Sequence, residues 1–207
     1  MEEMKEKLCK SLFKIGAVKF GEFTLKSGLK SPVYIDLRVL ISYPRVMRKV
    51  ANQLMRKTIG LSFDRICGIP YAAISIATAL SLQADLPMVY PRKESKGYGT
   101  KRDIEGKYNA GDVVLVYDDL ITKGNSKIEA IKPLEEVGLV VKDIIVLIDR
   151  EQGGKEELKK LGYSLHSVLT LKDILKCLKK NKLITKEQHG DVMEYLEDPE
   201  GWTRKHK

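Results

Sequence analysis

Residues 113–126 combine side chains that could bind a sugar phosphate. The stretch begins with aliphatic and β-branched residues, turns acidic at Asp118 and Asp119, and passes through a polar turn into a helical pattern near Lys127. This order predicts a strand buried on both faces that ends at the ligand-binding edge of an open α/β sheet. Turn amides and a helix N-terminus suit a phosphate, whereas the carboxylates suit ribose hydroxyls or a metal ion that the ligand carries. The stretch therefore predicts a sugar-phosphate site.

A second segment with chemical potential precedes this stretch. Residues 91–111 are polar, basic and rich in glycine. Loops this long without structure of their own are uncommon in compact domains, and they are usually lids or disordered. A basic, glycine-hinged loop just before a phosphate site suits a lid over an anionic ligand, and an insertion without a role is the alternative.

The elements that must position these residues alternate along the chain. Strands are predicted at 63–69, 86–90, 113–117, 143–148 and 165–169, with helices at 72–83 and from about 127 to 138 between them. Such alternation predicts a mostly parallel, twisted sheet flanked by helices. Further helices are predicted up to Gly16, from Pro44, and over 171–180 and 185–196, whereas we expect the tail 201–207 to be frayed.

Two short apolar runs within residues 20–36 are separated by Ser27 and Gly28 and predict a hairpin. Its lysines and Tyr34 lie close to glycine turns. The hairpin is either a solvated surface feature or a hood over the substrate, and the residues alone do not decide between these two roles.

Composition limits the class of protein. With 207 residues, 43% of them hydrophobic, the chain can bury a core as a single domain. The net charge of +9 suits a nucleic acid or a small, highly phosphorylated substrate, and we interpret most lysines as a solvated face. The three distant cysteines favour reduced thiols over a zinc site or disulfides. The sequence contains no apolar run long enough for a signal peptide or membrane span, so we expect a soluble, cytoplasmic protein.

The central motif resembles the signature of type I phosphoribosyltransferases, which is a hydrophobic strand, an acidic pair and Thr-x-Gly-x-Ser. Three further segments, at 23–32, 92–99 and 149–154, narrow the resemblance to the orotate phosphoribosyltransferase family. The likeness runs from the first helix to about Leu175. It implies a single domain over 1–207, with a hood from about 1–40 plus C-terminal parts, a core over about 60–170 and a mobile loop over about 92–110.

The resemblance implies a reaction. Orotate and 5-phospho-α-D-ribose 1-diphosphate give orotidine 5′-monophosphate and diphosphate, with Mg²⁺, in the biosynthesis of UMP. The metal would be held mostly by oxygens of the donor, so no protein ligand to it is expected. The family also implies a homodimer with shared active sites. The loop is similar to that of bifunctional enzymes that carry orotidylate decarboxylase, so association with a separate decarboxylase is another expectation; neither nucleic acid nor a membrane is an expected partner.

The resemblance also implies roles for particular residues. Asp118 and Asp119 would hold the ribose hydroxyls beside a developing cation, and together with Lys96 they form the expected catalytic group. The 5′-phosphate would be cradled by the turn, within the donor-binding run Leu120, Ile121, Thr122, Lys123, Gly124, Asn125 and Ser126. The diphosphate would be met by Tyr71, Ala72, Arg92, Lys93, Lys96 and Tyr98, of which Arg92 and Tyr98 would act with Lys96 from the neighbouring subunit. Orotate would be bound by Lys26, Tyr34, Ile35 and Arg150.

Four positions depart from the family pattern. Lys123 stands where a small residue is expected, and Asn125 where glycine or serine is common. Both are tolerated if backbone amides bind the phosphate, but a crowded turn would weaken donor binding. Ala72 replaces a lysine found in many bacterial relatives, and Tyr98 replaces a histidine whose proton-transfer role a phenol of pKa about 10 cannot take over.

Two other functions remain open alternatives. The nearest is a phosphoribosyltransferase for another base, such as a purine or uracil, and Lys26 and Arg150 argue against it. The other is a regulator that kept this fold and binds nucleic acid, which the net charge permits.

Overall fold

The computed structural model describes residues 2–25, 28–92 and 103–206. The chain forms two compact units, one made of Met1–Val46 with Leu171–Lys207 and the other of Met47–Thr170.

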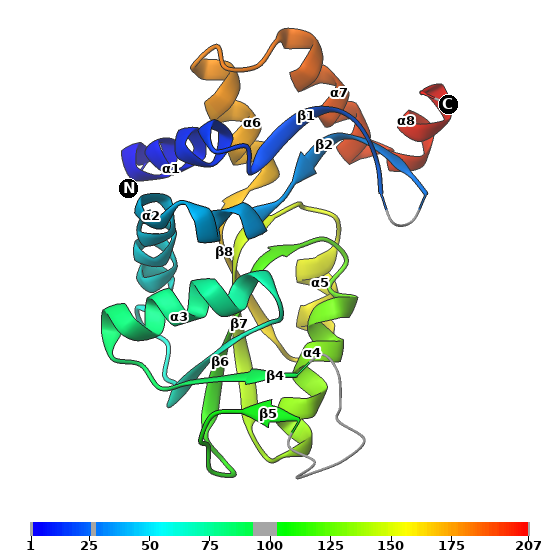
Figure 1. Ribbon diagram of the computed structural model, residues 1–207. Coiled ribbons are helices and arrows are strands. Elements are labelled where there is room, and N and C mark those ends of the chain that lie inside the picture. The colour runs from blue at the N-terminus through cyan, green and yellow to red at the C-terminus, as the bar shows by residue number, and fades with distance from the viewer. Residues whose placement is uncertain (1, 26–27, 93–102, 207) are drawn as a thin grey trace. The chain divides into compact units, whose positions relative to one another are not determined.

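The larger unit is built on a six-stranded sheet with the order β5-β4-β3-β6-β7-β8 (Figure 1). Its strands are β3 (Arg65–Gly68), β4 (Met88–Pro91), β5 (Ile104–Glu105), β6 (Val113–Ile121), β7 (Val140–Asp149) and β8 (Ser164–Thr170). All neighbouring pairs are parallel except β4 and β5, which pair antiparallel at one edge. The predicted mostly parallel α/β sheet is confirmed.

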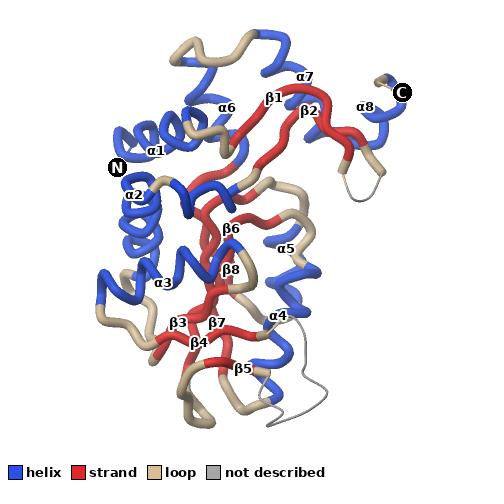
Figure 2. Tube along the Cα trace, viewed as in Figure 1, coloured by secondary structure: helices blue, strands red, loops and turns tan. Residues whose placement is uncertain are grey.

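Helices cover both faces of this sheet. Figure 2 shows α3 (Ala72–Ala84) on one face and α4 (Asn125–Glu136) with α5 (Gly154–Lys160) on the other. Helix α2 (Pro44–Met55) and the short 3₁₀ turn η2 (Arg56–Thr58) precede β3. This cover explains why the middle strands read as continuous apolar runs, since both of their faces are buried.

The core of the larger unit lies around β6 and β7. Val114, Val116, Ile144 and Val146 alternate on one side of these strands and are fully buried, with Ile131 and Leu134 of α4 packed in the same cluster. The core therefore fixes the two strands whose carboxyl ends carry the acidic pair and Arg150.

The smaller unit contains the predicted hairpin, now seen as β1 (Val18–Thr24) paired antiparallel with β2 (Lys30–Ile35). A 3₁₀ turn, η1 (Leu37–Ser42), follows it. The helices of this unit are α1 (Glu2–Lys14), α6 (Leu171–Lys180), α7 (Lys186–Glu197) and α8 (Pro199–Lys205).

The prediction of a frayed C-terminal tail was wrong, because α8 continues to Lys205. Asp198 caps this helix by accepting a hydrogen bond from the Gly201 amide, and Pro199 occupies its first turn. Trp202 is buried and packs edge-on against Tyr195 of α7, with ring centroids 5.9 Å apart. This aromatic contact gives the short helix the packing that its length alone would not supply.

Other predicted bounds also changed. The segment predicted as a loop over about 92–110 includes the edge strand β5, α4 begins at Asn125 rather than near Lys127, and β6 extends through the acidic pair to Ile121. The three cysteines are buried and form no disulfide, as expected. No helix within the described residues combines the length and apolar character needed to cross a bilayer.

Candidate active site

The acidic pair lies at the carboxyl end of β6, inside the strand rather than after it. Asp118 is buried, and one of its oxygens accepts a hydrogen bond of 2.8 Å from the Asp119 amide. Asp119 is only partly buried, and its Oδ1 accepts a 2.7 Å hydrogen bond from the Leu120 amide. Because consecutive residues of a strand point to opposite faces, the two carboxylates have different surroundings, and Asp119 is the more accessible.

The turn that follows has the backbone expected of an anion site. Gly124 is the N-cap of α4 and has a φ of 92°, a conformation that other residues rarely adopt. Its carbonyl accepts from the Lys127 amide at 2.9 Å, while the first amides of a helix have no partner within the helix. The turn can therefore offer backbone N–H groups to an anion.

The two residues of the turn that depart from the family pattern lie at the surface. The side chains of Lys123 and Asn125 are exposed, as is that of Ser126, whereas Gly124 is buried. Both substituted side chains are therefore open to solvent rather than packed inside the turn, and Lys123 adds a positive charge at the surface.

The end of β7 lies beside the same turn. Asp149 is level with Ile121 in the parallel register, and the Arg150 amide donates a 3.0 Å hydrogen bond to the Ile121 carbonyl. Arg150 is buried. Burial raises the pKa of Asp149, although the Glu151 amide donates to its carboxylate at 2.8 Å and opposes the rise. The structure therefore brings the predicted base-binding arginine next to the predicted donor site.

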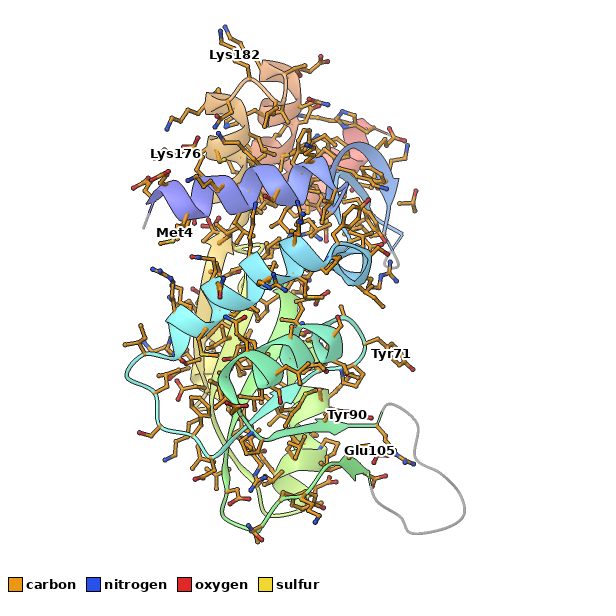
Figure 3. The ribbon with its side chains drawn as sticks, turned by 60° about the vertical axis from the view of Figure 1, so that its left-hand side comes forward. Met4, Tyr71, Tyr90, Glu105, Lys176 and Lys182 are labelled. Atoms are coloured by element: carbon orange, nitrogen blue, oxygen red, sulfur yellow. The ribbon has the colours of Figure 1, made fainter. Side chains whose placement is uncertain are left out.

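The ends of two further strands complete this edge of the sheet. After β3, the Ile69 amide donates to the Tyr117 carbonyl at 3.0 Å, and Tyr71 follows at the start of α3 through a cis peptide bond with Pro70. Tyr71 is 63% exposed and extends outward from this loop (Figure 3), and Ala72 behind it is half-buried.

Arg92 follows β4, and its guanidinium forms an ion pair with Glu105 on the antiparallel strand β5. Tyr90 and Glu105 face each other in the register of these strands (Figure 3). The Arg92 amide also donates a 2.8 Å hydrogen bond to the Asp103 carbonyl, so the two residues that flank positions 93–102 are bonded to each other.

Comparisons with known proteins agree with this geometry. A family model described as a phosphoribosyl transferase domain matches residues 43–168. The chain is 37% identical over 179 residues to an orotate phosphoribosyltransferase of Chlamydia caviae, covering 86% of this chain and 87% of that protein. This chain belongs to the orotate phosphoribosyltransferase family.

Solved structures and longer relatives extend the likeness. The crystal structure of an orotate phosphoribosyltransferase from Aeropyrum pernix superposes with a TM-score of 0.75 at 35% identity, covering 86% of this chain and 99% of that one. A uridine 5′-monophosphate synthase of Bos taurus is 44% identical over 193 residues. That alignment covers 92% of this chain but only 40% of the bovine protein, so the chain spans two fifths of that relative's length.

Two further residues predicted for this member of the orotate phosphoribosyltransferase family belong to the smaller unit. Tyr34 and Ile35 belong to β2 of the smaller unit, where Tyr34 stacks at a tilt on Phe23 with centroids 5.4 Å apart and Ile35 is buried. The Arg38 guanidinium donates to the Tyr34 hydroxyl at 3.3 Å. The positions of Lys26, Lys93, Lys96 and Tyr98 lie outside the described residues.

Sequence reasoning missed one residue of the site, Lys127. Its Nζ atom lies 2.5 Å from Oδ2 of Asp118, and both side chains are 7% exposed. The helical pattern that starts near Lys127 does not predict this contact. A lysine in the first turn of a helix is nevertheless unusual, because the positive end of the helix dipole disfavours it. A lysine at this end of a helix is therefore the sequence signal that indicates a nearby negative partner.

Proposed function

We propose that this chain transfers the 5-phosphoribosyl group of 5-phospho-α-D-ribose 1-diphosphate to orotate, giving orotidine 5′-monophosphate and diphosphate. The C1–O bond to diphosphate breaks, and a C1–N bond to the pyrimidine ring forms. The observation that carries the proposal is the shared sheet edge, where the acidic pair, the Gly124-capped helix and Arg150 meet. Membership in the family supports the choice of substrates.

The donor fits this edge by charge. The amides from Thr122 to Ser126 face the 5′-phosphate at the N-terminus of α4, a helix of 12 residues. Asp119, the more accessible carboxylate, takes ribose hydroxyls and lies near the carbon that becomes cationic as the C1–O bond breaks. Binding the phosphate and the ribose on one rigid strand-turn-helix unit orients C1 for transfer.

The leaving diphosphate requires cations and hydrogen-bond donors. Tyr71 extends from the end of β3, and Arg92 stands at the end of β4. We assign Lys96 and Tyr98 the same task by family resemblance, and Lys93 joins them as an added charge. A loop that closes over the donor also excludes water, which limits hydrolysis.

Orotate is a flat anion, and a guanidinium fork suits its carboxylate or carbonyl edge. The bond from the Arg150 amide to the Ile121 carbonyl brings Arg150 next to the turn, which supports this role. We assign Lys26, Tyr34 and Ile35 to the same base, with the ring of Tyr34 available for packing on the pyrimidine face.

In this proposal Mg²⁺ binds together with the donor. Among residues 2–25, 28–92 and 103–206, no three His, Cys, Asp or Glu side chains gather in a group that could hold a metal ion. The donor's diphosphate and ribose oxygens fit Mg²⁺ well, since this ion commonly binds substrate phosphates and keeps several waters. When bound, the ion neutralises charge on the leaving diphosphate, and no side chain is assigned to it.

We further propose a cytoplasmic homodimer in which Lys96, together with Arg92 and Tyr98, completes the partner's site. Association with a separate orotidylate decarboxylase is part of this proposal. It is supported by the bovine uridine 5′-monophosphate synthase, of which this chain matches only two fifths.

The proposal is tested by supplying the protein with the donor, Mg²⁺ and one base at a time: orotate, uracil or hypoxanthine. We expect orotate absorbance to fall while orotidine 5′-monophosphate forms, with no product from the other bases. Product from uracil or hypoxanthine but none from orotate would overturn it. Salt-sensitive binding of RNA or DNA without any turnover would favour the nucleic-acid alternative.

The shared-site proposal has its own test. Lys96→Ala and Asp119→Asn variants, each inactive alone, should regain some activity when mixed, because one hybrid site contains neither change. No recovery after confirmed subunit exchange would contradict action across the dimer.

A further inference from the structure

Lys127 and Asp118 form a buried ion pair that joins the first turn of α4 to the end of β6, beside the proposed donor site. The two residues are nine positions apart in sequence. They come from α4 and β6, on either side of the turn over residues 122–126, which we call the phosphate turn. The N–O distance is 2.5 Å, and each side chain is 7% exposed. Lys127 Nζ also lies 3.4 Å from the Ser126 hydroxyl, so one ammonium links the acidic pair to the turn.

A pair in this position requires an explanation beyond stability. Taking two charges out of water costs much of what their attraction returns, and apolar residues of similar size often stabilise a fold better. Both carboxylate oxygens of Asp118 are engaged, one by Lys127 and the other by the Asp119 amide. The Asp118 carboxylate is therefore held in one orientation at the end of the strand.

The groups around Asp118 give the pair an electrostatic role as well. Burial raises the pKa of Asp118, the negative charge of Asp119 adds to the rise, and the ammonium of Lys127 opposes both. Cys67 on β3 is a further neighbour, and its own thiol pKa is raised by burial and by Asp118, so it stays neutral. The pKa of Asp118 stays above its ordinary value even with this opposition, so Lys127 is the cation that favours the ionised carboxylate against burial and against Asp119.

We propose that Lys127 is a positioning residue for the phosphoribosyl donor, which fixes the Asp118 carboxylate and ties the phosphate turn to β6. This inference rests on the proposed function. The two acidic residues then have different roles: Asp119 contacts the donor, whereas Asp118 and Lys127 hold the site in shape.

The test measures the dissociation constant of the donor with Mg²⁺ by calorimetry at several pH values, without orotate. Lys127→Met removes the charge and keeps the length of the side chain, Lys127→Arg keeps the charge, and Lys132→Met changes an exposed lysine on the same helix. We expect Lys127→Met to weaken donor binding roughly tenfold, with a loss that grows as the pH falls from 8 to 6. Arginine at 127 should largely restore binding, and Lys132→Met should match the wild type.

The pH effect has a definite sign. Without Lys127, the pKa of Asp118 rises further, so the carboxylate is protonated at a higher pH than in the wild type. Phosphates of the donor titrate equally in all samples, so the difference between variants isolates Asp118. A folded Lys127→Met protein with wild-type affinity at every pH would overturn the inference.

The combined variant Asp118→Asn/Lys127→Met covers the case in which Lys127→Met does not fold, because it leaves no buried charge. If Lys127 acts through Asp118, the combined variant should bind the donor as well as Asp118→Asn alone. A further tenfold loss would contradict the positioning role. A wild type that binds the donor but never consumes orotate would overturn the proposed base and leave this inference standing.

Discussion

Gly154, the first residue of α5, packs directly against the backbone of Thr122 in the phosphate turn. A Cβ atom added at Gly154 would lie 2.5 Å from the Thr122 carbonyl oxygen and 2.7 Å from Cγ1 of Ile121. No side chain fits there unless the turn moves. The last glycine of segment 149–154 therefore supports the phosphate turn from the neighbouring loop.

We expect Gly154→Ala to weaken donor binding and to lower the free energy of unfolding by about 1–3 kcal/mol, the usual cost of overpacking. The matched control is Gly153→Ala, because Gly153 has a φ of 90° but nothing within 4 Å of its Cβ position. The control should lose stability through backbone strain and keep its KM for the donor. Equal donor KM values in the two variants would show that the turn does not depend on Gly154.

The ion pair between Arg92 and Glu105 predicts that Glu105 and the donor's diphosphate compete for the Arg92 guanidinium. Both side chains are about one-third exposed, so the pair contributes only about 0.2–1 kcal/mol. If Arg92 leaves Glu105 to meet diphosphate, Glu105→Gln should lower the donor KM by up to about threefold, since the competing carboxylate is gone. Asp103→Asn makes the same charge change at an exposed neighbour and serves as the control. A higher donor KM in Glu105→Gln would instead mean that Glu105 holds Arg92 in its working position.

Glu6 predicts the acid sensitivity of the smaller unit. Its carboxylate accepts bonds from Lys10 at 2.8 Å on α1, and from Lys180 and Asn181 at the end of α6 at 3.0 and 3.2 Å. These bonds lower its pKa from 4.5 to about 2, with Lys10 the largest cause. A depressed pKa gives stability that is present above pH 4.5 and is lost as the pH falls toward 2.

Urea unfolding from pH 7 to pH 2 should therefore show Glu6→Gln less stable than the wild type at neutral pH, with the difference closing in acid. Glu2→Gln, an exposed change on the same helix, should cost less throughout. A difference between wild type and Glu6→Gln that stays constant down to pH 2 would be inconsistent with the lowered pKa.

The site at the sheet edge could be predicted because its signals are local. A continuous apolar run at 113–117, an acidic pair and a glycine before a helix each have a direct structural meaning, and the parallel sheet follows from their alternation with helices. The residues missed depend on contacts between distant parts of the chain. Trp202 of α8 packs against Tyr195, and Lys127 pairs with Asp118 across a turn. Neither contact produces a repeating pattern of residues that could be recognised in the sequence. Asp198 followed by Pro199 nevertheless predicts the start of α8, because aspartate is a common N-cap and proline is common in the first turn of a helix.

In the proposed function, the acidic pair at the end of β6 serves transfer of phosphoribose to orotate. Orotate consumption by the wild type and by Asp119→Asn, followed in parallel with saturating donor and Mg²⁺, tests this role most directly. Asp119 is only partly buried, so we expect both proteins to have the same melting temperature. The wild type should form orotidine 5′-monophosphate and diphosphate in equal amounts, and Asp119→Asn should be at least about 100-fold slower, the scale for losing one electrostatic contact to a transition state. A wild type that leaves orotate unchanged, or two proteins that consume it at the same rate, would contradict the claim.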